Sequence, residues 1–233
     1  MESEEIEETE EVGELEEVAI FPLATVLFPG TLLPLHIFED RYKAMIRFAI
    51  DNGRVFGLSY RSDAQVGKET PPSVGSIGCA AKIDAVIPLE EGRMNILSTG
   101  VVRYRILEIK QTVPFLIARV APFSDDPEPD ADLTRLYNDT KEVSEKFLEA
   151  VRELNENELS GNVTLPDEPE ALSLFMASTL PVDNNAKQRL LELTSTRVRL
   201  SRVRHQLLEA MSEYGERLRV HERAKRNGHG KLH

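Results

Sequence analysis

The sequence predicts an α+β protein, with a mainly antiparallel β-domain followed by an α-helical bundle that ends in a long helix. Three observations support this fold class. Short apolar segments separated by turns fill residues 18–123, and an acidic, proline-containing linker follows at 124–131. Apolar residues then recur at helical spacing over 132–220. Because the segments of the first half are short and adjacent in sequence, we expect antiparallel pairing there.

Charge is distributed unevenly along the 233 residues, whose net charge is −12. Residues 1–17 contain ten Glu and no Lys or Arg, which is typical of a disordered acidic arm. From Arg197 to the end, ten basic residues accompany four Glu. We expect residues 221–233 to form a frayed basic tail. The two expected domains are therefore flanked by an acidic and a basic segment.

The first part of the β-domain is rich in proline. Because Pro22, Pro29 and Pro34 cannot donate a backbone hydrogen bond to a sheet, the strands here are expected to be short or at an edge. The sequence Phe-Pro-Gly at 28–30 separates two apolar runs and indicates an open hairpin. Residues 40–51 predict an amphipathic helix, because their apolar side chains recur at i, i+3, i+4 and i+7.

Strands are expected through the rest of the first half. A hairpin turn is predicted at 90–93. Tyr104, Ile106 and Leu107 break the strict alternation of a strand, which indicates a bulge. The expected strand segments are 55–60, 77–89, 94–112 and 113–123, and 77–89 is either a pair of strands or one bent strand.

Helices account for the second half. We expect helices at 131–157, at 169–180, at 184–193 with Asp183 as N-cap, and from about Ser195 onward with Ser195 as N-cap. The last helix carries an apolar stripe at steps of three and four residues: Leu200, Val203, Leu207, Ala210, Tyr214 and Leu218. Packing within its own domain is favoured for this stripe over pairing with a second copy.

Several kinds of functional site lack their motifs. Gly67-Lys68 is followed by Glu69, and position 62 is Ser, so the phosphate-binding loop of ATPases is absent. The five histidines are dispersed, and no G-x-S-x-G motif occurs. We therefore predict no catalytic residue, no metal and no cofactor. A single cysteine, Cys79, an acidic start and the lack of a long apolar run favour a cytoplasmic protein without a membrane segment.

Three segments, in order, resemble the N-terminal substrate-recognition domain of Lon proteases. They are PLATVLFPGTLLPLHIFEDRY followed by RVFGLSY, then VGSIGCAAKIDAVIPLEEGRMNILSTGVVRYRILEI, and finally ASTLPVDNNAKQRLLELTSTRVRLSRV. The resemblance covers roughly residues 18–210 and implies a PUA-like β-rich half, a helical half and binding of polypeptide substrates. The ATPase and Ser–Lys protease modules of Lon proteases have no counterpart here, so the resemblance implies a non-enzymatic protein.

The candidate peptide-binding residues are Phe28, Leu32, Leu33 and His36, within the first of these segments. A turn precedes Leu32 and Leu33, so the two leucines need not both point into the core. An exposed leucine pair beside a groove would suit unfolded, apolar polypeptide segments.

For any single residue of 27–42, a structural role is favoured over direct contact with a ligand. In that case Phe28, Leu35 and Phe38 fill the core, and Arg41 either pairs with Glu39 or holds backbone carbonyl groups. A second pair of candidates, Arg103 and Arg105, has the same parity on a strand and is expected to share a face. That face is either solvated or a contact for an anionic partner.

Two function classes follow from the sequence. The first is a module that binds unfolded or client polypeptides and cooperates with a protease or chaperone, as a monomer or weak homodimer. The second is a PUA-like RNA-binding module, in which the basic tail contacts phosphates. The negative net charge and the scarcity of aromatic residues make nucleic acid the less favoured partner.

Overall fold

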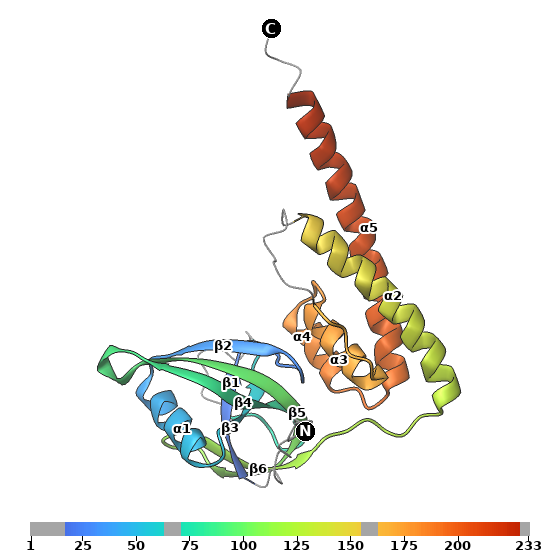
Figure 1. Ribbon diagram of the computed structural model, residues 1–233. Helices are drawn as coiled ribbons and strands as arrows, with labels where there is room; N and C mark the ends of the chain where they lie inside the picture. The colour runs from blue at the N-terminus through green and yellow to red at the C-terminus, as the bar shows by residue number, and fades with distance from the viewer. Residues whose placement is uncertain (1–16, 63–70, 155–162, 229–233) are drawn as a thin grey trace, which may run out of the picture.

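The computed structural model confirms a mixed α+β protein with a mostly antiparallel sheet and a group of helices (Figure 1). The structure describes residues 17–62, 71–154 and 163–228. Side chains are described for these residues except 130–132, 153–154 and 213 onward. The expected acidic arm, apart from Glu17, and the last part of the expected basic tail lie outside the described residues.

Within the described residues, six strands form the β-half. Their bounds are β1 Glu17–Leu23, β2 Leu32–Ile37, β3 Val55–Tyr60, β4 Ile77–Pro88, β5 Met94–Gln111 and β6 Leu116–Pro122. Hydrogen bonding gives the order β2-β5-β4-β3-β1-β6, and β5 also pairs with β6. This last pairing closes β5, β4, β3, β1 and β6 into a ring, and β2 lies at the edge, against the first part of β5. All pairs are antiparallel except β1 with β3.

The open hairpin expected around residues 28–30 is wrong. β1 pairs with β3 and β6, whereas β2 pairs with β5. The connection between β1 and β2 is held against β5, because Gly30 N donates to Gly100 O at 2.8 Å. A Cβ atom at position 100 would lie 2.2 Å from the carbonyl oxygen of Phe28, so only glycine permits this approach. A turn sequence shows where the chain bends but does not fix which strand it joins.

The other expected elements of the β-half match the structure closely. The helix predicted at 40–51 is α1 Asp40–Asp51, and its apolar side packs on the sheet. A short 3-10 turn, η2 Glu90–Gly92, joins β4 to β5 where the hairpin turn was expected. The predicted bulge is confirmed, because the register between β5 and β6 shifts between Ile106 and Glu108.

The helical half consists of four helices within the described residues: α2 Asp130–Leu154, α3 Pro169–Thr179, α4 Asn184–Leu191 and α5 Thr196–Gly228. Both predicted caps are confirmed. The Asp183 side chain accepts from Ala186 N at 2.7 Å, and Ser195 Oγ accepts from Val198 N at 3.1 Å. None of the described helices combines the length and apolar composition that crossing a membrane requires.

The apolar stripe of α5 packs inside the molecule over its described part. Leu200, Val203, Leu207 and Ala210 are buried in one cluster with side chains of α2 and α3. The side chains of Tyr214 and Leu218 lie outside the described residues. The helix continues to Gly228, beyond residue 220 where the basic tail was expected to begin. In Figure 1 this part of α5 extends away from the β-half.

The two halves dock through both apolar and polar contacts. Phe28, Ile77 and Phe123 from the β-half join the apolar cluster of the helices. Tyr60 Oη donates to Asn185 Oδ1 at 3.1 Å, and further hydrogen bonds reach across from α4. The β-half therefore presents one covered end, toward the helices, and other surfaces that no described element covers.

Candidate functional site

The four predicted binding residues do not lie together. Leu32 and His36 are exposed on the outer side of β2, and Leu32 retains 67% of its accessible surface. Leu33 points to the other side of the strand and packs against the apolar cluster beneath α1. Phe28 is fully buried in the cluster formed with the helices. The alternation of side chains along β2 separates Leu32 from Leu33, so only Leu32 and His36 share a surface.

Phe38 lies on the surface, so the expectation that it fills the core is wrong. It is 59% exposed, and its ring centroid lies 5.8 Å from that of His36. The inward position at the end of β2 is taken by Ile37, which is 1% exposed. His36 Nδ1 lies 2.7 Å from Asn95 Oδ1 on β5. These contacts extend the surface of β2 onto the neighbouring strand.

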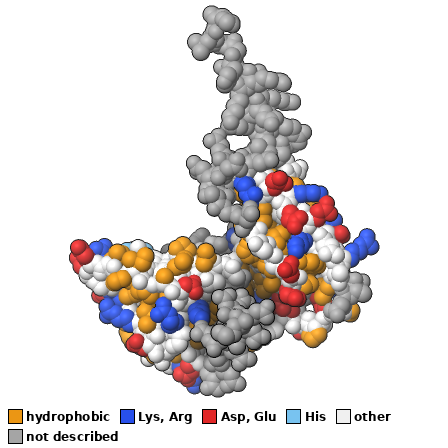
Figure 2. Space-filling model, in the orientation of Figure 1, with side chains coloured by type: hydrophobic (Ala, Val, Ile, Leu, Met, Phe, Trp, Pro, Cys, Tyr) orange, Lys and Arg blue, Asp and Glu red, His pale blue; other side chains and the backbone are white. Residues whose placement is uncertain are grey.

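The strands next to β2 continue this surface with apolar side chains. Pro34 pairs with Leu97 of β5, and Leu97 pairs with Ala85 of β4. Asn95 pairs with Ile87 in the same way. We define the exposed apolar face as these neighbouring residues: Leu32, Pro34, Phe38, Ala85, Ile87, Leu89 and Leu97. Figure 2 shows hydrophobic side chains gathered on the side of the β-half where Figure 1 places β2.

The contribution of β4 and β5 to this face was not predicted from the sequence. In the segment 94–99 the buried positions are Met94, Ile96 and Ser98, and the exposed side contains Asn95, Leu97 and Thr99. Leu97 is thus an apolar residue at a position where the alternation of the strand otherwise gives polar residues. The sequence contains this signal. Its neighbours on β2 and β4 could not be known without the strand order.

A second cluster of functional groups occupies the junction between the halves. Arg103 and Arg105 do share a face, because their guanidinium carbons lie 4.9 and 5.0 Å from the ring centroid of Phe123. Arg105 is exposed, but Arg103 is only 2% exposed. A solvated position is therefore wrong for Arg103, because the helices cover this part of β5.

The junction is a network of two buried arginines around one carboxylate. Arg103 Nη2 donates to Asp125 Oδ1 at 2.5 Å and to Glu170 Oε1 at 2.9 Å. Arg199 Nη1 donates to Asp125 Oδ1 at 3.1 Å, and Arg199 Nη2 also pairs with Asp125. Arg103 further donates to the carbonyl oxygens of Leu191 and Leu193. Two cations and two carboxylates thus compensate each other where the halves meet.

Ionisation of Asp125 depends on these partners. Burial by itself raises the pKa of this carboxyl group, but hydrogen bonds from Arg199, Thr196 and Arg103 and the charge of Arg199 outweigh burial. The resulting pKa lies below the ordinary value for Asp. Burial also lowers the pKa of Arg199, and Asp125 opposes that shift. The guanidinium stays charged near neutral pH. Arg103, Arg199, Asp125 and Glu170 thus bind one another, and the network holds the halves together.

Candidate nucleophiles and metal ligands within the described residues include Cys79 and the His, Asp and Glu side chains. Burial raises the pKa of the Cys79 thiol, which leaves it protonated and unreactive at neutral pH. Across residues 17–62, 71–154 and 163–228, no group of three or more His, Cys, Asp or Glu side chains converges to hold a metal ion. The surface with the clearest capacity for interaction is the exposed apolar face.

Comparisons with known proteins agree with this architecture. The family model of the ATP-dependent protease La (LON) substrate-binding domain matches residues 17–209. The Lon protease of Desulfosudis oleivorans is 27% identical over 194 residues, which is 82% of this chain and 24% of that protein. For the Lon protease of Dictyoglomus thermophilum the identity is 24% over 208 residues, 89% of this chain and 26% of that protein. The chain thus spans about a quarter of the length of these relatives.

Solved structures share the fold. The Lon N-terminal domain protein from Xanthomonas campestris is 20% identical with a TM-score of 0.56, and the match covers 80% of this chain and 96% of that chain. The N-terminal domain of Mycobacterium avium complex Lon protease is 19% identical with a TM-score of 0.62, covering 82% of this chain and 98% of that one. The family match detects no ATPase or protease domain in the 233 residues. Because the family model matches most of the sequence, the chain belongs to the Lon substrate-binding domain family.

Proposed function

We propose that this protein binds unfolded or client polypeptides at the exposed apolar face and that it has no enzymatic activity of its own. The observation that carries the proposal is the exposure of large apolar side chains on three adjacent strands. Leu32 on β2, Ile87 on β4 and Leu97 on β5 are 67%, 60% and 38% exposed. Large contiguous exposed apolar patches mark interaction or ligand-binding sites in soluble proteins.

The composition of the face suits an apolar partner. None of its seven residues is charged, and its central row, Pro34–Leu97–Ala85, crosses three strands. β2 is an edge strand, so an extended segment of polypeptide can lie alongside it. Pro34 lacks a backbone N–H, which limits continuous strand pairing. Side-chain burial, rather than a long ladder of hydrogen bonds, is therefore the main source of affinity.

The expected affinity of one contact is low. Burying two exposed aliphatic side chains contributes about 3–5 kcal/mol before the cost of ordering the client. A free energy of this size corresponds to dissociation constants from roughly the high micromolar to the millimolar range. Useful capture then requires several contacts along one client, or several copies of the protein.

The cellular role follows from this weak, sequence-tolerant binding. In our proposal the PUA-like β-half captures clients in the cytoplasm as an adaptor for a protease or chaperone. The protein acts as a monomer or a weak homodimer. An RNA-binding role is less well supported, because the exposed apolar face lacks Lys and Arg, and phosphate contacts require them. The salt dependence of binding distinguishes RNA binding from polypeptide binding, because phosphate contacts weaken steeply with salt and apolar contacts do not.

Fluorescence anisotropy with a labelled, reduced and carboxymethylated model protein tests the proposal. The double variant Leu32→Gln/Leu97→Gln should weaken binding at least tenfold, because it removes two apolar side chains from the face. The matched control is Val198→Gln/Leu208→Gln, which removes two exposed apolar side chains of α5. If both double variants bind like the unchanged protein, or lose affinity equally, the face is not the binding site.

A further inference from the structure

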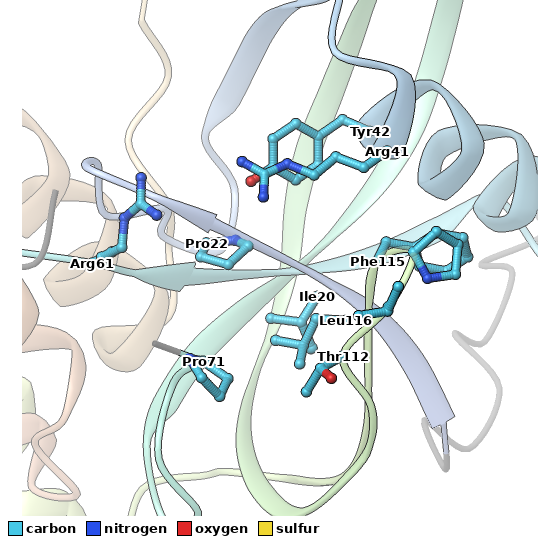
Figure 3. Close-up of a pocket in the computed structure, with 11 residues that line it drawn as sticks. Ile20, Pro22, Arg41, Tyr42, Arg61, Pro71, Thr112, Phe115 and Leu116 are labelled. Atoms are coloured by element: carbon cyan, nitrogen blue, oxygen red, sulfur yellow. The ribbon is translucent and has the colours of Figure 1, made fainter. Parts of the chain in front are cut away.

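A separate pocket lies between β1, the start of α1 and the turn that joins β5 to β6. Its volume is about 190 Å³, and Figure 3 shows its lining side chains. It shares no lining residue with the exposed apolar face. Its size is below that of ordinary pockets for drug-sized ligands, so a nucleotide is too large for it.

Most residues that line this pocket have apolar side chains, although polar atoms account for about half of its exposed wall. Ile20 and Pro22 of β1 and Leu116 of β6 contribute side chains, and Pro114 and Phe115 come from the turn before β6. None of the described residues that line it is acidic. Any charge in the pocket is therefore positive, and it comes from Arg41 and Arg61.

Arg61 is the unusual residue of this site. Its Nε atom is buried and has no hydrogen-bond partner among the described residues. A buried donor without a partner costs about 1–3 kcal/mol, and more when the group is charged. Arg41 differs, because its Nε donates to Glu39 at 2.9 Å and its guanidinium lies over the Tyr42 ring. In Figure 3 both guanidinium groups lie above Pro22, and Ile20 and Leu116 lie below it.

We propose that this pocket binds a carboxylate attached to a compact apolar group, with Arg61 as the principal donor. A carboxylate can pair with the partly exposed guanidinium of Arg61, which makes no side-chain hydrogen bond with a described residue, and guanidinium and carboxylate match in geometry. The apolar walls then contact the attached group. Inorganic phosphate fits less well, because a dianion without an apolar substituent leaves those walls in contact with a charged group. A free small carboxylic acid and the C-terminal residue of a polypeptide both offer the required chemistry.

Calorimetric titration of the full chain tests this site. N-acetylleucine should bind with saturation, and N-acetylleucine amide, which lacks the carboxylate, should bind at least tenfold more weakly. Arg61→Gln should weaken binding of the acid at least tenfold. The matched control Arg189→Gln, an exposed arginine on α4, should change it less than twofold. Equal binding of acid and amide, no binding of either, or tighter binding of inorganic phosphate would overturn the proposal.

Two further measurements keep the test decisive. If the Arg61→Gln variant unfolds, an NMR titration of the unchanged protein takes the place of that variant. N-acetylleucine should shift the amide signals of Thr112, Phe115 and Arg61. Unshifted signals would refute the site. A hexapeptide ending in leucine, as free acid and as amide, distinguishes the sources. A free-acid peptide that binds tighter than N-acetylleucine identifies a polypeptide end, and equal or weaker binding identifies a small acid. The pocket and the exposed apolar face have no residue in common. The carboxylate test can therefore fail while binding of unfolded protein persists, and binding of unfolded protein can fail while the carboxylate still binds.

Discussion

The two parts of strand β5 have opposite surroundings. Its first part, through residue 99, places Leu97 on a surface that no described element covers. Its later part places Arg103 beneath the helices, where it is 2% exposed and fully engaged by carboxylates and carbonyl groups. An apolar side chain is thus exposed and a charged one buried on the same strand. The network at the junction explains why Arg103 is buried. No described element covers Leu97, and we therefore assign this side chain to the proposed binding face.

The largest loss of stability is expected at the junction, where the helices cover β5. Asp125→Ala leaves Arg103 and Arg199 buried without their shared carboxylate, and breaking a buried pair in this way costs about 3–5 kcal/mol. Urea unfolding should show this loss, and the adjacent, exposed Asp126→Ala should change the unfolding free energy by less than about 0.5 kcal/mol. Equal stability of both variants would mean that the network does not hold the junction together.

Gly100 lies between the two parts of β5. In Gly100→Ala the new Cβ meets the carbonyl oxygen of Phe28, whose side chain belongs to the cluster with the helices. Overpacking of this kind costs about 1–3 kcal/mol. Thermal unfolding should show a lower Tm. A Tm equal to that of the unchanged protein would show that the connection to β2 moves aside freely.

Adjacent leucines on β2 sharpen the comparison further. Leu33→Ala removes contacts with the apolar cluster and should lower the unfolding free energy by about 1–3 kcal/mol. Leu32→Ala should change it by less than about 0.5 kcal/mol, because that side chain is largely exposed. Denaturant titrations of both variants measure the difference. A reversed order would place Leu32 in the core and remove it from the binding face.

Lowering the pH should weaken the charge network at the junction and leave the exposed apolar face unchanged. The pKa of Asp125 is lower in the folded protein than in the unfolded chain, so this group stabilises the fold above the unfolded value of about 4. That contribution should be lost as pH falls through the lower, folded pKa. Asp125→Asn, which cannot titrate, should lack this part of the pH dependence. Identical pH profiles of stability for the two proteins would contradict the assignment.

The sequence predicted most elements but not their neighbours. Periodicity and capping residues located α1, α4 and the start of α5, because these signals are local. The predicted partner of β2 was wrong, because its pairing with β5 depends on contacts between residues distant in sequence. The same limit applies to the site. Leu32 and His36 were identified from their own segment, but Ile87 and Leu97 join them only through strand order.

Arg103 illustrates a second limit. Alternation correctly placed it on the same face as Arg105, since both contact Phe123. Burial could not be inferred, because it results from Asp125 in the segment expected to be a linker and from Arg199 in α5. Long-range charge pairs of this kind leave no periodic signal in the sequence.

The central claim, that clients bind the uncovered part of β5 and its neighbours, is tested most directly by NMR titration. The isotopically labelled protein is mixed with an unlabelled, reduced and carboxymethylated model protein, and amide signals are followed. We predict shifts or broadening at 32–38, 85–89 and 95–99, with unchanged signals at Arg103 and along α5. Perturbation confined to α5 or to the junction, with the signals of 95–99 unchanged, would contradict the account.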